Sequence, residues 1–176
     1  VRVVSAVALC DSQKQKLEKI WNQSDKKMII CGQLNPDIAL LTELKALAAD
    51  PSVAILVENT SNLVDYGFIH CIDRTLNSIS KEEIEAFSPD LLITIGGAVV
   101  SKRIKTFLRN ANIAHHWKIG FDFLFMDTYQ SMTQSIPVKP SEFIHQVTHF
   151  KRESDSTFGA KWKQKDFLIQ EKANQF

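Results

Sequence analysis

The amino-acid sequence predicts an α/β domain with a doubly wound, mostly parallel sheet and helices on both faces. Two observations support this fold class. Short, almost wholly apolar runs recur along the 176 residues, and segments with helical periodicity lie between them. Apolar runs of this length are typical of strands in a parallel sheet, because helices cover both faces of such a sheet. The alternation of the two kinds of segment favours the doubly wound arrangement.

The composition narrows the class of protein. The chain is 44% hydrophobic and 23% charged, which suits one globular domain with a sizeable core. Its 21 Lys and Arg residues against 20 Asp and Glu leave a net charge of +1, so we do not expect a nucleic-acid partner held by bulk charge. The sequence shows neither an apolar run of about 18 residues nor the pattern of a signal peptide. We therefore expect a cytoplasmic protein that does not bind a membrane.

The first third of the chain contains a strand–helix–strand unit. We expect a helix capped by Asp11–Ser12 and running to Trp21, a strand over 27–32, a helix with Asn35 as N-cap and Pro36 at its first position that extends to Ala48, and a strand over 52–57.

The remaining elements follow the same alternation. They are expected as a helix over 71–79, a short helix that opens with a capping box over 80–83 and ends at Phe87, a strand over 91–95 broken by Gly96–Gly97, a helix over 100–109, a strand over 113–119, a loop over 121–126, a strand over 131–138, and a helix over 140–150. Residues 1–26 are a leading segment with one helix, and 1–150 form the central domain. Residues 151–157 are a predicted linker before a terminal helix over 160–174, which has little to pack against without a neighbour.

Ligands in an open parallel sheet bind beyond the carboxyl ends of the strands. This rule selects the segments 32–35, 58–62 and 96–103 and the end of the strand near Trp117. In the third segment, Ser101, Lys102 and Arg103 fall in the first turn of a helix.

Cations are unfavourable at the first turn of a helix unless an anion lies nearby. The apolar face of this helix consists of Val100, Ile104, Phe107 and Leu108, so packing requires neither Lys102 nor Arg103. Exposed N–H groups, two glycines and two cations together indicate a pocket for a carboxylate or a phosphate. The alternative is that two solvated basic residues fall there by chance.

Other kinds of site have weaker support. Gly32 and Glu58 lie where a dinucleotide-binding domain carries its glycine loop and ribose-binding acid, but the further glycines are missing. His145 and His149 share a helix face without a third metal ligand, and His115 and His116 point to opposite faces of a strand, with one expected packed and the other exposed.

No motif for a nucleophile is present in the sequence either. Cys10, Cys31 and Cys71 have spacings that indicate neither a disulfide framework nor a zinc site, and we expect buried thiols. We therefore expect no catalytic, metal-binding or cofactor-binding residue in this chain.

The segment 95–109 resembles the stretch IGGxxVSKRxKxFLR of the menaquinone-pathway synthases that make 2-succinyl-5-enolpyruvyl-6-hydroxy-3-cyclohexene-1-carboxylate. Residues 88–94, His116–Trp117 and 58–63 are also similar to that family, particularly to its form in Bacteroidetes-like bacteria. The resemblance covers residues 26 to 150, and Ser101–Arg103 is its most specific part.

The resemblance implies a Rossmann-like middle domain from an enzyme of three α/β domains that uses thiamine diphosphate and Mg²⁺. The flanking domains would bind these cofactors, because the sequence lacks the Gly-Asp-Gly motif with paired asparagines and the activating glutamate that those domains carry. Residues 151–176 would lead toward a missing third domain. The first residue, Val1, likewise indicates a chain cut from a longer protein, or one that has lost a tag.

The family reaction decarboxylates 2-oxoglutarate and adds the resulting carbanion to isochorismate. The resemblance implies that Lys102 and Arg103, with Ser101, bind substrate carboxylates, and that Arg103 could also bind the product dihydroxynaphthoate as an inhibitor. It further implies a homo-oligomer for the full-length enzyme and no activity for the isolated domain. Two alternatives remain: a middle domain of another thiamine enzyme that binds FAD or ADP, and a purely structural domain that docks its neighbours.

Overall fold

The structure, a computed structural model, describes residues 9–122, 125–150 and 155–174. Its centre is a five-stranded sheet in the order β2-β1-β3-β4-β5, and every neighbouring pair is parallel. The strands span Lys27–Cys31 (β1), Val53–Val57 (β2), Leu91–Ile95 (β3), His115–Ile119 (β4) and Gln134–Ile136 (β5). Every residue of β1, β2 and β3 is buried, which explains their uninterrupted apolar sequences. The predicted α/β fold class is therefore confirmed.

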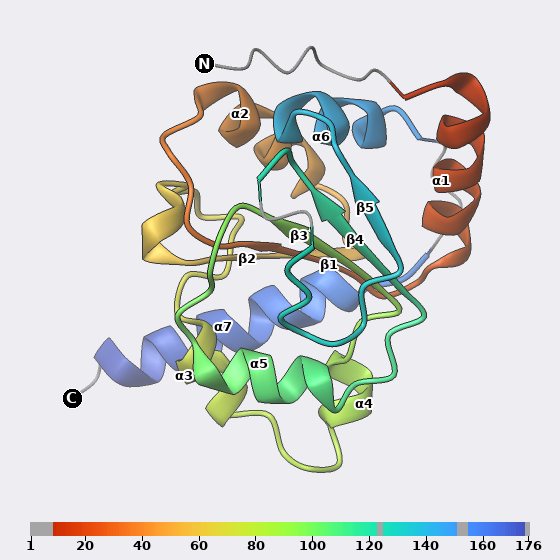
Figure 1. The fold of residues 1–176 in the computed structure, drawn as a ribbon. Helices are drawn as coiled ribbons and strands as arrows, with labels where there is room; N and C mark the ends of the chain where they lie inside the picture. Colours follow the sequence, from red (N-terminus) through yellow and green to blue (C-terminus); the bar gives the residue numbers. More distant parts are fainter. Residues whose placement is uncertain (1–8, 123–124, 151–154, 175–176) are drawn as a thin grey trace.

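Helices cover both faces of the sheet (Figure 1). One face carries α1 (Asp11–Gln23), α2 (Ile38–Leu47) and α6 (Pro140–Thr148), and the other carries α3 (Ile72–Asn77), α4 (Ile84–Phe87), α5 (Lys102–Arg109) and α7 (Phe158–Asn174). A short 3₁₀ helix, η1 (Asn59–Ser61), follows β2.

Each face has its own apolar core. Leu44 and Phe143 pack with Trp117 of the sheet on the α2 face. On the α5 face, Ile104 and Trp162 pack with sheet residues such as Leu92. The described residues include no helix that is both long and apolar enough to cross a membrane.

The terminal helix α7 packs firmly on the α5 face, so the expectation that it has little to pack against is wrong. Trp162 is fully buried, and its ring lies 5.3 Å from that of Phe87 and 6.2 Å from that of Phe107. Its indole N–H donates to the Phe87 carbonyl over 3.2 Å. A Cβ on Gly159 would lie 2.0 Å from the backbone oxygen of Val53, so only glycine allows α7 to approach β2 this closely.

Two helix starts differ from their predictions. Asp37, and not Asn35, is the N-cap of α2, since its carboxylate accepts from the backbone N–H of Leu40 over 2.9 Å. Pro36 therefore lies before the helix. Cys10 precedes α1, and its backbone N–H donates to the Gln13 side chain over 3.0 Å, whereas Asp11–Ser12 was expected to cap this helix.

The other element boundaries agree with the sequence to within a few residues. The last predicted strand is shorter than expected, because β5 has only three residues within 131–138. Parts of the predicted leading segment, loop and linker, namely residues 1–8, 123–124 and 151–154, lie outside the described residues.

Candidate functional site

The loops that follow β1 and β3 are hydrogen-bonded to each other at the carboxyl edge of the sheet. The backbone N–H of Gln33 donates to the Ala98 carbonyl over 3.1 Å, and that of Gly97 donates to the Gln33 carbonyl over 2.8 Å. Two of the predicted segments, 32–35 and 96–103, therefore form one connected surface, as the carboxyl-edge rule indicates.

Gly96 ends β3 with a left-handed turn. Its φ angle is +79°, and a Cβ at this position would lie 2.6 Å from the Gln33 carbonyl oxygen. A side chain is thus excluded both by backbone conformation and by space. The turn allows the chain to leave the sheet and begin α5 at the carboxyl edge.

Ser101 fixes the first residue of α5. Its hydroxyl accepts from the backbone N–H of Ile104 over 3.1 Å and donates to Asp73, and its own N–H donates to the Glu58 carboxylate over 3.0 Å. Two N–H groups that the sequence suggested as exposed anion donors therefore already have partners within the chain. Glu58, considered above as a ribose-binding acid, has one carboxylate oxygen in this network. These two N–H groups are therefore not available to an anion, and side chains would have to supply further contacts.

Lys102 and Arg103 supply such side chains. Both are exposed, and neither side chain has a hydrogen bond or an ion pair with any residue that the structure describes. They line a pocket of about 530 Å³ between α3 and α5, here called the α3–α5 pocket, and also an adjoining apolar groove of about 400 Å³ that includes Leu76 and Phe107. The predicted cations thus reach two hollows at the start of one helix.

The charge around the α3–α5 pocket is mixed. Arg74 joins Lys102 and Arg103 at its wall, and the Nε of Arg74 is covered without a partner among the described groups. Glu58 and Asp73 line the same wall, but each already accepts a hydrogen bond from Ser101. Three cations therefore face two engaged carboxylates, an arrangement that suits a ligand carboxylate or phosphate. Sequence analysis missed Arg74 and Asp73 because a helix pattern does not show which side chains will face a distant loop.

The apolar face of α5 differs from the prediction at one position. Ile104 and Leu108 are fully buried, and Phe107 is partly buried, but Val100 is 68% exposed. Val99 is buried instead. Helical periodicity does not extend back to Val100, because the helix begins only after Ser101.

The fourth predicted segment lies apart from the two cations. Trp117 is fully buried in the core, and the loop after β4 lines a separate pocket of about 440 Å³ with Gln33, Asn35 and Asp122. This pocket adjoins the ends of β1 and β3. The structure therefore places the four segments around two pockets rather than one.

The histidine pair of α6 has no metal-binding geometry. His145 Nδ1 lies 3.2 Å from a Glu43 carboxylate oxygen, and His149 Nδ1 lies 2.7 Å from the His145 carbonyl oxygen. Within the described ranges, no group of three or more His, Cys, Asp or Glu side chains could hold a metal ion.

The cysteines only partly follow their prediction. Cys31 is buried, and burial raises its pKa to about 12. Cys10 and Cys71 are exposed, so the expectation of three buried thiols is wrong for these two. Both precede helices, α1 and α3, and neither lies on the sheet.

His116 is buried in β4, whereas His115 beside it is partly exposed, as expected for successive strand positions. The His116 ring nitrogens lie 3.0 Å from the Thr94 and Ser131 hydroxyls. Burial lowers the pKa of His116 to about 4, with a smaller lowering by Lys118 and an opposing effect of Asp127. The imidazole is therefore neutral near pH 7.

This pKa predicts a loss of stability in acid. Between pH 6.5 and 4 the unfolded chain binds a proton at His116 and the folded chain does not, so the free energy of unfolding falls as the pH falls through this window. The contribution of His116 is fully present above pH 6.5. Urea unfolding across this range measures the slope in the native chain and in the variant His116→Gln. We expect a shallower slope in the variant, and equal slopes would contradict the assignment.

Comparison with known families now places the chain in a class. Residues 5–176 match the family model described as the middle domain of thiamine pyrophosphate enzymes, and the chain belongs to this family. The five-stranded parallel sheet is consistent with that class.

Individual relatives carry a more specific name. The chain is similar to the 2-succinyl-5-enolpyruvyl-6-hydroxy-3-cyclohexene-1-carboxylate synthases of Christiangramia forsetii, Flavobacterium johnsoniae and Cytophaga hutchinsonii. The identities are 41%, 35% and 30%, over 62%, 74% and 92% of this chain. The aligned parts cover only 20%, 24% and 28% of those relatives, so the chain spans about a quarter of their length.

Proposed function

We propose that the chain is the middle domain of a synthase that decarboxylates 2-oxoglutarate and joins the remaining fragment to isochorismate in menaquinone biosynthesis, and that Lys102 and Arg103 bind substrate carboxylates. The name shared by the relatives supports the reaction. The observation that carries the role of the residues is the pair of exposed cations at the start of α5, whose side chains have no partner among the residues that the structure describes.

The chemistry of the substrates agrees with this site. Both 2-oxoglutarate and isochorismate carry carboxylates, and a guanidinium or ammonium group binds a carboxylate through charge-assisted hydrogen bonds. Ser101 was expected to bind substrate as well, but its hydroxyl is engaged with Asp73 and Ile104, so we propose that it contributes by fixing the helix start. We also propose that Arg103 serves as the contact for an inhibitory aromatic carboxylate such as dihydroxynaphthoate.

In this proposal the cofactors bind to other parts of the enzyme. Thiamine diphosphate would supply the chemistry of decarboxylation and carbon–carbon bond formation, and Mg²⁺ would bind its diphosphate. Flanking domains would bind both cofactors, and the full-length protein would be a cytoplasmic homo-oligomer. This chain would bind and orient anionic substrates at the edge of the shared active site.

The test is substitution in the full-length enzyme. Lys102→Ala and Arg103→Ala should each raise the KM for one substrate, or lower kcat/KM, by about tenfold or more, because each removes an interaction worth about 1.4 kcal/mol. Steady-state kinetics with each substrate varied in turn measures the change. The isolated 176-residue chain should show no turnover, and unchanged kinetics in both variants would refute the proposed role of the two residues.

A further inference from the structure

Two lysines of the sheet are almost completely buried, at opposite ends of the strands. Lys27, at the start of β1, is 2% exposed, and Lys118, near the end of β4, is 3% exposed. A buried ammonium group lowers stability unless hydrogen bonds compensate for the lost water. Lys27 donates to the Ser52 hydroxyl over 3.1 Å, whereas Lys118 donates to the backbone carbonyl of Gly96.

The partner of Lys118 is the residue at which the chain turns from β3 toward α5. Gly96 has a left-handed backbone, and Gly97 after it donates to the Gln33 carbonyl over 2.8 Å. Lys118 and Gln33 therefore hold the carbonyl and the N–H of the same peptide, the one that joins Gly96 to Gly97. Four residues after Gly97, Ser101 caps the helix that carries Lys102 and Arg103.

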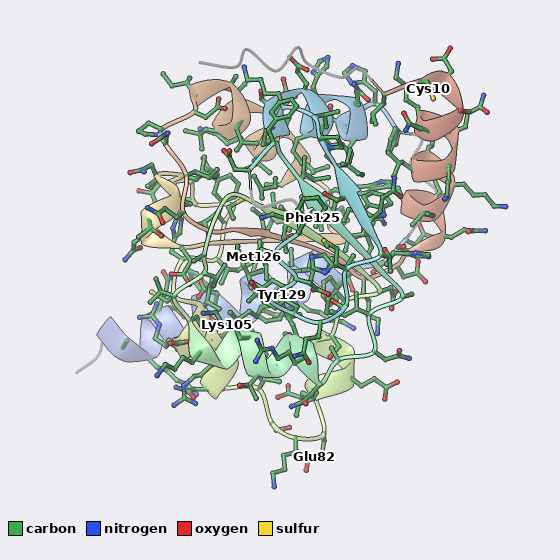
Figure 2. All side chains as sticks on the ribbon, in the orientation of Figure 1. Cys10, Glu82, Lys105, Phe125, Met126 and Tyr129 are labelled. Carbon is green, nitrogen blue, oxygen red and sulfur yellow. The ribbon has the colours of Figure 1, made fainter. Side chains whose placement is uncertain are left out.

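The bond from Lys118 to Gly96 is shielded from solvent. Tyr129 is 4% exposed, and with Met126 and Lys118 it lines a cavity of only about 10 Å³. Figure 2 shows Met126 and Tyr129 between the sheet and α5, in agreement with the 5.9 Å between the rings of Tyr129 and His116. A charged donor in such surroundings forms a stronger hydrogen bond than it would in water. Burial also lowers the pKa of Lys118.

We propose that Lys118 is a positioning residue for Lys102 and Arg103. Its ammonium group fixes the Gly96 carbonyl, and this sets the point and the direction at which α5 leaves the sheet. Lys118 does not touch the substrate, because it lies beneath the turn. The inference rests on the proposed function of the two cations.

The matched variants are Lys118→Met and Lys27→Met in the full-length enzyme. Methionine keeps an unbranched side chain of similar size and removes the buried charge, but each variant also loses one buried hydrogen bond, so both should lose a modest and comparable amount of stability. We expect Lys118→Met to raise the KM for the substrate that the two cations bind by about tenfold, since a displacement of about 1 Å can cost up to about a hundredfold. Lys27→Met, at the far end of the sheet, should leave KM within about twofold.

A second comparison separates positioning from general structural damage. Lys118→Met is combined with Lys102→Ala and Arg103→Ala. If Lys118 acts through these cations, it should have almost no further effect on KM in their absence, whereas independent effects multiply. Thermal unfolding of each variant shows whether any KM change follows a change in stability. Should Lys118→Met fail to fold, Lys118→Gln undergoes the same comparison.

The outcomes distinguish this inference from the proposed function. If the two cations prove kinetically silent, the proposed function fails and the inference fails with it. Suppose instead that removing the two cations raises KM. The inference alone is then overturned if Lys118→Met keeps a native KM, or if its effect on KM multiplies with that of Lys102→Ala and Arg103→Ala. A raised KM that disappears in the combined variant, with no greater loss of thermal stability than in Lys27→Met, supports it.

Discussion

Replacing Trp162 by alanine is expected to lower the free energy of unfolding of this chain by about 3–5 kcal/mol. The ring is fully buried between α7 and the sheet and has edge-to-face contacts with Phe87 and Phe107. The variant also leaves the Phe87 carbonyl without its indole donor. Such a change is a large fraction of the stability of an ordinary domain, which is about 5–15 kcal/mol.

Urea or guanidinium unfolding of the 176-residue chain measures this effect. Phe167→Ala is the matched control, since Phe167 is an aromatic residue of the same helix but is 59% exposed, and its substitution should change stability by about 0.5 kcal/mol or less. A loss below about 1 kcal/mol for Trp162→Ala would contradict the packing of α7 on this domain.

Reversal of both cations should have the largest effect on activity. In the full-length enzyme, Lys102→Glu with Arg103→Glu removes two attractive interactions with substrate carboxylates and adds repulsion at the same pocket. Two interactions of about 1.4 kcal/mol each correspond to a fall of about a hundredfold in kcat/KM, and the repulsion should lower it further.

Lys105 provides the control for net charge. It lies on the same helix, one turn beyond Lys102 (Figure 2). Its side chain lines neither the α3–α5 pocket nor the adjoining groove. Lys105→Glu should therefore change kcat/KM by about twofold or less. An equal fall of kcat/KM in Lys105→Glu and in the double reversal would show that the effect comes from the electrostatic field of the helix and not from contacts with the substrate.

The parts of the fold that local physics determines were predictable from sequence. The apolar runs of β1, β2 and β3 are buried on both faces, and this burial is what produces such runs. The end of β3 was predicted because two glycines follow it, but α5 was expected from residue 100 and begins at Lys102. The start of α2 was predicted two residues too early, because contacts with a distant loop fix the backbone before Asp37. The backbone N–H of Leu34, for example, donates to the Thr60 carbonyl over 3.1 Å.

Long-range contacts explain what the sequence analysis missed. The packing of α7 depends on Phe87, which is 75 residues away from Trp162 in sequence. The bonds from Ser101 to Glu58 and to Asp73 span 43 and 28 residues. Lys118 lies in a predicted strand, and no local pattern indicates that its hydrogen-bond partner is the carbonyl of Gly96, in the turn after β3. The prediction of an anion site at Lys102 and Arg103 rests on their contradiction of a local rule at the helix terminus, and such contradictions tend to mark functional sites.

Sequencing the coding DNA on both sides of this segment tests whether the chain is the middle domain of a thiamine-diphosphate-dependent synthase. We expect an upstream domain with the glutamate that activates the cofactor, and a downstream domain with Gly-Asp-Gly followed by paired asparagines. A start codon just before Val1 together with a stop codon just after Phe176 would contradict the claim.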